Sequence, residues 1–461
     1  MMVELPPVTV PHKYIECSLC SDRRMKMKAK ILFLVFLLSF SSNIISANAK
    51  LKTEESVFIH YIDKQKTNQL KLLEDLVNIN SGTGNRPGVE KVGERVRTEL
   101  DGLGFKTQWV NLPAAMKHAG SLVATHSGTG KKILIIGHLD TVFPSTSPFQ
   151  SFELSSDQLS ATGPGVLDDK GGLVTILYAF KALNHAGKLK YANITVVLSG
   201  DEEQAAKPTS ISRKALREAA KGSDIALGFE FTLAKNQLVT ARRGLSEWYL
   251  SGRGKTGHSS NIFQTASGDG AIYETARVLN SFRITLSNIP GLTLNPGIIL
   301  GGQAVKEDTQ QNIGNARGQK TIISAQTLVH GDLRFLSDEQ KRMAEQKMRE
   351  ITMTPLPLTS SQLIFNDIIP VMPETNANRQ LLAEFSDISM ALGRSSLQAV
   401  PATERGGADI SYIAQYVAAS LDGLGPSGRG AHSQNEILEV ASLPEATKRT
   451  AIFINRLLDV N

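Results

Sequence analysis

The first part of the chain alternates segments in which apolar residues recur at helical spacing with short runs of apolar and β-branched residues. Helical spacing predicts one helix that ends at residues 74–79 and two more at 89–103 and 171–183. Short apolar runs, typical of buried strands, lie at 132–136 and 194–198. This alternation predicts an α/β fold in which helices flank a sheet on both faces.

The pattern changes near residue 244. Strands of alternating character and longer helices then predict an inserted α+β domain, with strands at 248–250, 297–300 and 327–335 and helices at 271–282 and 338–351. The first pattern later returns, with helices expected at 381–392, 410–416 and 443–458. We therefore predict one α/β domain built from residues 50–243 and 372–461, interrupted by a domain of ordinary size at 244–371.

The first 49 residues have the features of an export signal. Basic residues at 23–30 precede an apolar run at 31–38, and Ala47-Asn48-Ala49 provides the small residues that signal peptidase accepts. The run is shorter than the roughly 20 apolar residues of a membrane-spanning helix, so cleavage after Ala49 and a periplasmic or secreted product are favoured over an uncleaved anchor. A start of translation at Met25 or Met27 would leave a signal of conventional length.

Charge and cysteine content limit what the exported chain can do. Of 50 basic and 44 acidic residues, 44 and 41 lie from Lys50 onward, a balance too close to neutral to indicate nucleic acid or a membrane as partner. Only 6% of the residues are aromatic, which argues against stacking on bases. Both cysteines, Cys17 and Cys20, lie in the leader, so any metal has to be held by His and carboxylate side chains.

Residues with metal-binding chemistry follow the predicted strands. His138 and Asp140 come directly after the strand at 132–136, and residues two apart on an extended segment face the same side. His138 can therefore bind a metal while Asp140 holds its second ring nitrogen. Asp168 stands just before the helix at 171–183, next to glycines that allow a tight turn. Taken alone, the first motif also fits a polar strand end and the second a helix cap.

Three acids and a histidine extend this set. Glu202 and Glu203 follow Asp201 after the strand at 194–198, and the repulsion among them is offset either by solvent or by a cation. In the second case one acid binds the metal and its neighbour acts as a general base. Glu230 lies between two phenylalanines, where a carboxylate is costly to bury without a cation or hydrogen bonds. His432 lies in a glycine-rich loop, where a histidine is more often a surface residue.

The combination of these motifs is more specific than any one of them. All lie at strand ends or in adjacent loops, which is the edge where open α/β sheets form their sites. Nitrogen and oxygen ligands without sulfur suit zinc and also tolerate cobalt or manganese.

Five motifs in this order resemble the co-catalytic zinc metallopeptidases, a family that includes glutamate carboxypeptidase, aminoacylase, acetylornithine deacetylase and succinyl-diaminopimelate desuccinylase. The motifs read GHLDTV, GPGVLDDKGG, DEE, FE and GLGP…HS. The similarity to the glutamate carboxypeptidases is greatest, because Asp169 follows Asp168 and the loop at 406–409 resembles their glycine-rich loop. The resemblance runs from about Lys50 to the C-terminus.

The resemblance implies a site with two zinc ions in each subunit. Asp168 would bridge them, with the Asp168–Asp169 peptide cis, and Glu202 would be the general base. The ligands would be completed in two sets, His138 with Glu230 and Glu203 with His432, and Asp140 would orient His138. The implied activity is hydrolysis of an amide bond next to a free carboxylate, in a small peptide or an N-acyl amino acid.

The resemblance also implies a function for the inserted domain. Residues 244–371 would be a lid and dimerisation domain, and His258 would reach the active site of the partner in a homodimer and stabilise the oxyanion. Arg334 would bind the substrate carboxylate, although a surface salt bridge to Asp332 is an alternative. Thr321 stands where the family has a lid asparagine.

Two other stretches depart from the family pattern. A Gln/Asn-rich segment at 309–319 precedes Thr321, and the loop at 204–208 replaces a Gly-Ser turn. These departures bear on the preferred side chain or acyl group and leave the metal ligands intact.

Two alternative functions use the same sequence features. An exported aminoacylase would apply the same chemistry to N-acyl amino acids, and the sequence does not separate it from a carboxypeptidase. A non-enzymatic peptide-binding relative would be expected to lose a ligand or the base. All six positions are retained, which favours an enzyme.

Overall fold

The computed structural model describes residues 50–458 except 310 and 312. The export signal predicted for residues 1–49, with Cys17 and Cys20, lies outside this range and stays a prediction. In the part of the chain that is described, no helix combines the length and apolar character needed to cross a membrane.

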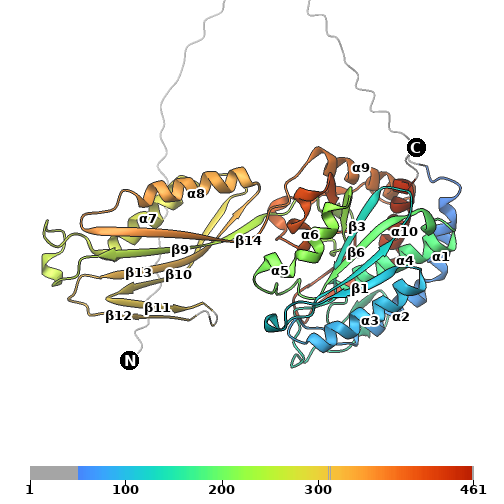
Figure 1. The fold of residues 1–461 in the computed structure, drawn as a ribbon, viewed down its shortest axis with the longest axis horizontal. Coiled ribbons are helices and arrows are strands. Elements are labelled where there is room, and N and C mark those ends of the chain that lie inside the picture. The colour runs from blue at the N-terminus through green and yellow to red at the C-terminus, as the bar shows by residue number, and fades with distance from the viewer. Residues whose placement is uncertain (1–49, 310, 312, 459–461) are drawn as a thin grey trace, which may run out of the picture. The chain divides into compact units, whose positions relative to one another are not determined.

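A six-stranded sheet organises the α/β part of the chain (Figure 1). Its order is β1 (Lys106–Val110), β2 (Ser121–His126), β6 (Asn193–Ser199), β3 (Lys132–His138), β7 (Ile225–Gly228) and β16 (Ala419–Leu421). Strands β6, β3, β7 and β16 run parallel, and the β1–β2 and β2–β6 pairs are antiparallel. The carboxyl ends of the four parallel strands therefore meet at one edge.

Helices cover both faces of this sheet, as the alternation along strand β3 requires. Ile133 and Ile135 join the larger core, whereas Leu134 and Ile136 face a second cluster. The larger core contains residues from α1 (Glu55–Lys64), α2 (Lys66–Val77), α3 (Arg86–Gly102), α4 (Lys170–His185), α9 (Asn376–Ala391) and α10 (Ser442–Leu458). The second cluster includes residues of α6 (Lys214–Lys221), which follows α5 (Thr209–Ser212). The predicted α/β fold is confirmed.

One predicted helix is wrong. Residues 410–416 form two 3₁₀ turns, η5 (Asp409–Tyr412) and η6 (Ala414–Tyr416). Ile410 and Ile413, three residues apart, are both buried in the smaller cluster. Residues three apart share a face in a 3₁₀ turn as they do in an α-helix, so the apolar spacing alone did not separate the two.

The segment from residue 244 builds a four-stranded antiparallel sheet with a core of its own. The strand order is β10 (Thr293–Gly302), β13 (Gln326–Phe335), β9 (Gly244–Gly254) and β14 (Thr359–Ile369), and α7 (Gly270–Leu286) and α8 (Asp338–Thr352) lie along it (Figure 1). Alternate residues of β9 and β13 are buried. They pack with Phe282 and Met348 from the helices around the fully buried Trp248. Every residue of this core falls within the predicted insert.

Smaller elements hold the loops together. A hairpin of β11 (Ala304–Asp308) and β12 (Ile313–Arg317) contains much of the Gln/Asn-rich segment. A four-stranded sheet joins β17 (Gly428–Arg429), β18 (Ile437–Glu439), β5 (Ser160–Thr162) and β4 (Glu153–Leu154). A parallel pair links β8 (Gln237–Leu238) with β15 (Gln398–Ala399). The remaining 3₁₀ turns are η1 (Ala114–Met116), η2 (Leu189–Tyr191), η3 (Ser259–Asn261) and η4 (Ala402–Glu404).

Candidate metal centre

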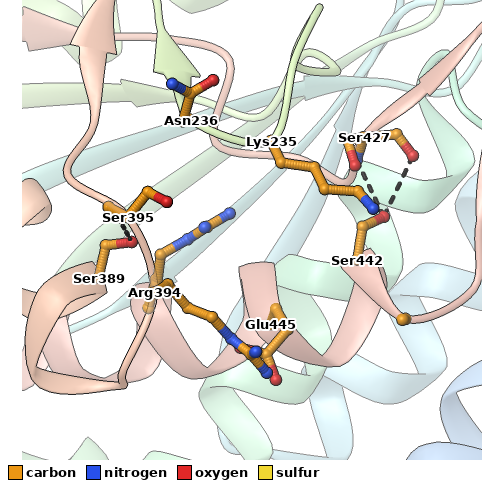
Figure 2. A pocket seen from close by; sticks show the side chains of 10 residues that line it. Lys235, Asn236, Ser389, Arg394, Ser395, Ser427, Ser442 and Glu445 are labelled. Atoms are coloured by element: carbon orange, nitrogen blue, oxygen red, sulfur yellow. Dashed lines mark hydrogen bonds and ion pairs between the residues drawn. The ribbon is translucent and has the colours of Figure 1, made fainter.

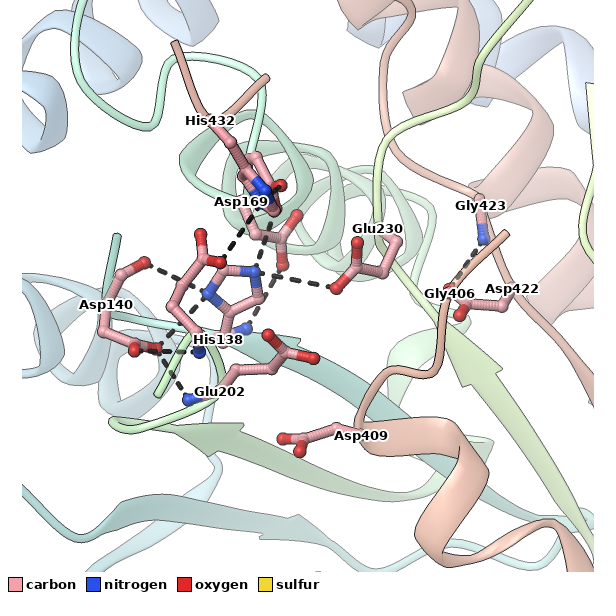
Figure 3. Close-up of polar contacts among 12 residues, drawn as sticks. His138, Asp140, Asp169, Glu202, Glu230, Gly406, Asp409, Asp422, Gly423 and His432 are labelled. Atoms are coloured by element: carbon pink, nitrogen blue, oxygen red, sulfur yellow. Dashed lines mark hydrogen bonds and ion pairs between the residues drawn. The ribbon is translucent and has the colours of Figure 1, made fainter. Parts of the chain in front are cut away.

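Imidazole and carboxylate side chains converge at the carboxyl edge of the parallel strands (Figure 3). His138 ends β3, Glu203 follows β6, and Glu230 follows β7. Asp168 precedes α4, and His432 lies in the turn between β17 and β18. The fold therefore brings together all five residues that the sequence identified as ligand candidates, including His432, whose loop alone indicated only a surface position.

Asp168 lies between the two histidines. His138 Nε2 is 3.0 Å from Asp168 Oδ1, and His432 Nε2 is 3.0 Å from Asp168 Oδ2. Each imidazole also faces one further acid, because His138 Nε2 is 3.7 Å from Glu230 Oε1 and His432 Nε2 is 3.2 Å from Glu203 Oε2. Two oxygens of one carboxylate, each directed to a different histidine, are the arrangement expected of a bridging ligand. The Asp168–Asp169 peptide is cis.

Asp140 ties His138 to the acidic loop. His138 Nδ1 is 3.1 Å from the carbonyl oxygen of Asp140 and 3.4 Å from its Oδ1, so the carbonyl is the nearer acceptor. The carboxylate accepts the backbone N–H groups of Glu202 and Glu203 at 3.0 and 3.1 Å, and the Thr83 hydroxyl at 2.7 Å. A single buried residue, through its carbonyl oxygen and its carboxylate, therefore orients both sides of the cluster.

Several buried carboxylates lie next to one another in the cluster, and their pKa values are shifted in opposite directions. Burial, followed by the Glu230 charge, raises the pKa of Glu202 well above its usual range, and burial with the Asp168 charge raises the pKa of Glu230 to about 7. Burial acts in the same direction on Asp168, but hydrogen bonds from His138 and His432 outweigh it and lower the pKa of Asp168. Hydrogen bonds to Asp168 and Glu203 raise the pKa of His432 to about 11. In this structure the histidines carry the positive charge that the carboxylates require.

The donor set fits two metal ions. Ligand atoms of His138, Asp168 and Glu203 lie within 4.8 Å of one another, as do those of His138, Glu202 and Glu230. Both of these sets contain His138. The shortest contacts instead separate the ligands into two groups that share Asp168, one with His138 and one with His432. We prefer the second grouping because each histidine then faces a further acid, Glu230 or Glu203. Glu203 Oε1 is buried without a hydrogen-bond partner, as expected of an atom that awaits a cation.

Glu436 supports Asp168 from the opposite side, a role that sequence analysis did not find. Its carboxylate is fully buried and accepts three backbone N–H groups, from Gly165 at 3.2 Å, Leu167 at 2.8 Å and Asp168 at 3.0 Å. The only signal in the sequence is its position four residues after His432. Glu436 therefore fixes the turn that presents Asp168.

Two buried arginines flank Glu230 and were also missed. Arg242 and Arg405 lie 3.9 and 3.6 Å from Glu230 Oε2, and Arg242 pairs with Asp422 at 2.7 Å. Their charges partly compensate the burial of Glu230. No local pattern indicates these contacts, because Arg405 with Glu230 and Arg242 with Asp422 join distant segments of the chain.

A cleft of about 880 Å³ opens beside the cluster. Glu202 and Glu203 line it together with the loop at 204–208, residues 366–369 and Asp409. The loop in which the chain departs from the family pattern is thus part of the cleft wall.

The predicted lid residues lie apart from the cluster. Among the described residues, His258 contacts Ser260 through Nδ1 at 2.8 Å, and Arg334 pairs with Asp332 at 3.0 Å, the alternative that the sequence left open. Thr321 accepts the backbone N–H of Ser259 at 2.8 Å, which places it beside His258. No contact within the described residues joins these three side chains to the metal ligands.

The fold and the site are those of a metal-dependent hydrolase of the co-catalytic type, and comparison with known proteins assigns the chain to a family. The sequence model of peptidase family M20/M25/M40 matches residues 134–456, and the chain belongs to this family. This confirms the resemblance found in the sequence and makes the chain a metallopeptidase or amidohydrolase, in a family with dinuclear metal-binding members.

One curated protein and two solved structures are similar to this chain over most of its length. Carboxypeptidase G2 of Pseudomonas sp. (strain RS-16) is 27% identical over 417 residues, which cover 89% of this chain and 94% of that protein. The aminopeptidase PepT of Bacillus cereus superposes with a TM-score of 0.67 at 19% identity, over 85% of this chain and 98% of that one. A dinuclear metal-binding peptidase of Bacillus subtilis superposes with a TM-score of 0.60 at 14% identity, over 87% and 100%. These structures support the fold.

Proposed function

We propose that this enzyme is a carboxypeptidase of the glutamate carboxypeptidase type, which hydrolyses an amide bond next to a free carboxylate. The observation that carries the proposal is the arrangement of Asp168 between His138 and His432, with Glu202 beside it at the cleft. The similarity to carboxypeptidase G2 over most of both chains supports the type of reaction.

Two ions, proposed to be zinc with cobalt or manganese as substitutes, would be held by His138 and Glu230 on one side, by Glu203 and His432 on the other, and by Asp168 between them. Bound there, they would supply Lewis acidity and lower the pKa of water to roughly 7. Proton transfer and the positioning of the groups are assigned to side chains of the protein.

Glu202 is the proposed general base. Its side chain makes no hydrogen bond or ion pair with the described residues, and it lines the cleft. Burial raises its pKa in the absence of cations, and two bound ions beside it would lower that pKa again, so that the ionised carboxylate would accept a proton from the attacking water and pass it to the leaving nitrogen. Asp140 holds the backbone of Glu202 and the ring of His138 in a fixed relation, so the base and the ligand keep their spacing.

The substrate type can be tested with three compounds. Metal-loaded enzyme is given a dipeptide, the C-terminal amide of the same dipeptide, and an N-acyl amino acid. We expect turnover of the dipeptide and none of its amide. Preferential turnover of the N-acyl amino acid would identify the chain as an aminoacylase, and equal turnover of acid and amide would contradict carboxylate recognition.

We further propose that the enzyme is a homodimer in which His258 serves the site of the partner subunit. Exposed apolar side chains on the insert support this, since Phe263, Tyr273 and Ile299 are at least half exposed. Mixing His258→Ala and Glu202→Gln variants under subunit exchange should restore activity, because a hybrid contains one intact composite site. No recovery despite exchange would show that His258 does not act across subunits.

The proposed location is the periplasm or the exterior, after cleavage behind Ala49. N-terminal sequencing of the protein from its native host should start at Lys50. A membrane-bound product that retains residues 31–38 would support the anchor instead.

A further inference from the structure

A second cavity, of about 260 Å³ and lined mostly by polar and charged residues, shares no lining residue with the cleft. It lies between α9, the start of α10 and the segment before β8. Figure 2 shows Lys235, Ser427 and Ser442 on one side of it and Ser389, Ser395 and Arg394 on the other. The proposed hydrolysis makes no use of this cavity.

Arg449 lines the cavity without a partner. Its side chain belongs to a residue that is 8% exposed, and its Nε is buried without a hydrogen bond. Within the described part of the chain, its guanidinium makes neither a hydrogen bond nor an ion pair. The buried Arg213 and Arg242, in contrast, each pair with an aspartate. Burial lowers the pKa of Arg449 to about 10, as expected of a cation with too little compensation.

The acids near Arg449 are engaged elsewhere. Glu445 binds Arg394 through Oε2 at 3.0 Å and Lys448 through Oε1 at 3.2 Å. Lys235 pairs with Glu439 at 2.8 Å. Of the three basic side chains that line the cavity, Lys235 and Arg394 are each paired with an acid, so Arg449 supplies the positive charge that is not compensated.

The start of α10 adds to this charge. The helix has 17 residues and begins at Ser442, on the cavity wall. The partial positive charge of a helix N-terminus favours anions. Glu445 in the first turn already offsets part of this charge, and the buried guanidinium of Arg449, which lacks an acceptor, is the second and stronger feature that favours an anion.

We propose that this cavity binds a small oxyanion, a phosphate or a carboxylate, with Arg449 as the main contact and Lys235 and Arg394 beside it. Guanidinium groups bind both kinds of anion through paired hydrogen bonds. The volume far exceeds the ~10–15 Å³ that a single ordered water needs.

The location links such a ligand to the metal centre. Ser427 donates its N–H to Ser442 Oγ at 3.0 Å, and the chain then leads to His432. Gly425 donates its N–H to the carbonyl of Glu230 at 3.0 Å, and Thr232 donates to the carbonyl of Pro426 at 3.1 Å. The cavity wall therefore belongs to the same two loops that carry two of the candidate ligands.

The test is thermal unfolding of the metal-loaded full chain titrated with sodium phosphate or sodium acetate, at constant ionic strength maintained with chloride. A ligand that binds only the folded state raises the midpoint by mass action. We expect at least one of the two anions to raise it, and Arg449→Met to abolish the rise that depends on this cavity. Arg456→Met is the matched control on the same helix, since Arg456 pairs with Glu55 and should keep the response.

The baseline without added anion is informative as well. Arg449→Met should unfold at the same temperature or higher, because it removes a buried charge without a partner. If that variant does not fold, Lys235→Gln should weaken anion binding several-fold by calorimetry. A response to acetate alone would identify a carboxylate as the ligand. No response of the wild type to either anion, or the same response in wild type, Arg449→Met and Lys235→Gln, would overturn the proposal.

Discussion

Asp140 Oδ1 accepts the backbone N–H of Glu202 at 3.0 Å. Through this bond the strand end that carries His138 fixes the position of the proposed base, which belongs to the loop after the neighbouring strand. Asp140 is fully buried, so the bond is shielded from competing water. The relative placement of base and ligand is thus a property of the folded scaffold and not of the bound metal alone.

Adjacent acids should have different functions. Glu202→Gln removes the proton acceptor but no assigned ligand, so we expect full metal content and a turnover lower by roughly 10²–10⁴-fold. Glu203→Gln should lose metal, because Glu203 faces His432. Elemental analysis and steady-state kinetics of both variants check this, and metal loss in the Glu202 variant alone would reverse the assignment.

Removing the metals should destabilise the enzyme. Asp168, Glu202, Glu203 and Glu230 crowd together, and without cations their repulsion opposes folding. Elemental analysis should find about two ions per subunit. Calorimetry after chelation should give a lower unfolding temperature, which zinc restores, and ligand at 100 times its Kd is worth about 2.7 kcal/mol. A chelated protein with unchanged activity and unfolding temperature would contradict the two-metal site.

Glu436→Gln should lower stability and metal affinity together. Three N–H groups point at the Glu436 carboxylate, and an amide would direct one of its own donors at them. We expect a loss of about 1–3 kcal/mol in the free energy of unfolding, measured with denaturant. Glu439→Gln, a change of the same kind at a partly exposed residue, is the control. Equal losses in the two variants would argue against a special role for Glu436.

Arg334→Lys should distinguish the two interpretations of this residue. Lysine can keep an ion pair with Asp332, but it cannot reproduce the paired hydrogen bonds of guanidinium to a carboxylate. If Arg334 binds the substrate, kcat/KM for a dipeptide should fall at least tenfold while metal content and folding stay normal. Unchanged kinetics would leave the pair with Asp332 as its function.

Much of the framework could be predicted from the sequence. The strand expected at 132–136 is β3, extended to His138, and the helix expected at 338–351 is α8, extended to Thr352. Both have a strong apolar period, which burial on one or two faces enforces. Strand β14 was missed because most of its residues are polar and only Leu363 is buried.

The candidate site divides in the same way. Most of its candidate ligands follow strands that the sequence predicts clearly. Because parallel strands end at the same edge of a sheet, the sequence also predicts that these ligands lie together. The contacts of Glu436 with Leu167 and of Arg242 with Asp422 could not be predicted, because they connect segments that are distant in the sequence and carry no local pattern. Side-chain packing in three dimensions creates these pairs.

The two histidines of the cluster differ in their access to solvent. The His138 side chain is 2% exposed and sits at the end of a central strand, whereas that of His432 is 57% exposed in a turn where its φ is +64°. An ion leaves a protein by losing its ligands one at a time, and the ligand that is exposed to solvent is expected to detach first. The half of the centre closed by His432 should therefore exchange its ion faster than the half closed by His138. A chelator should then release the two ions in separate kinetic phases, so that a singly loaded form of the enzyme persists between them.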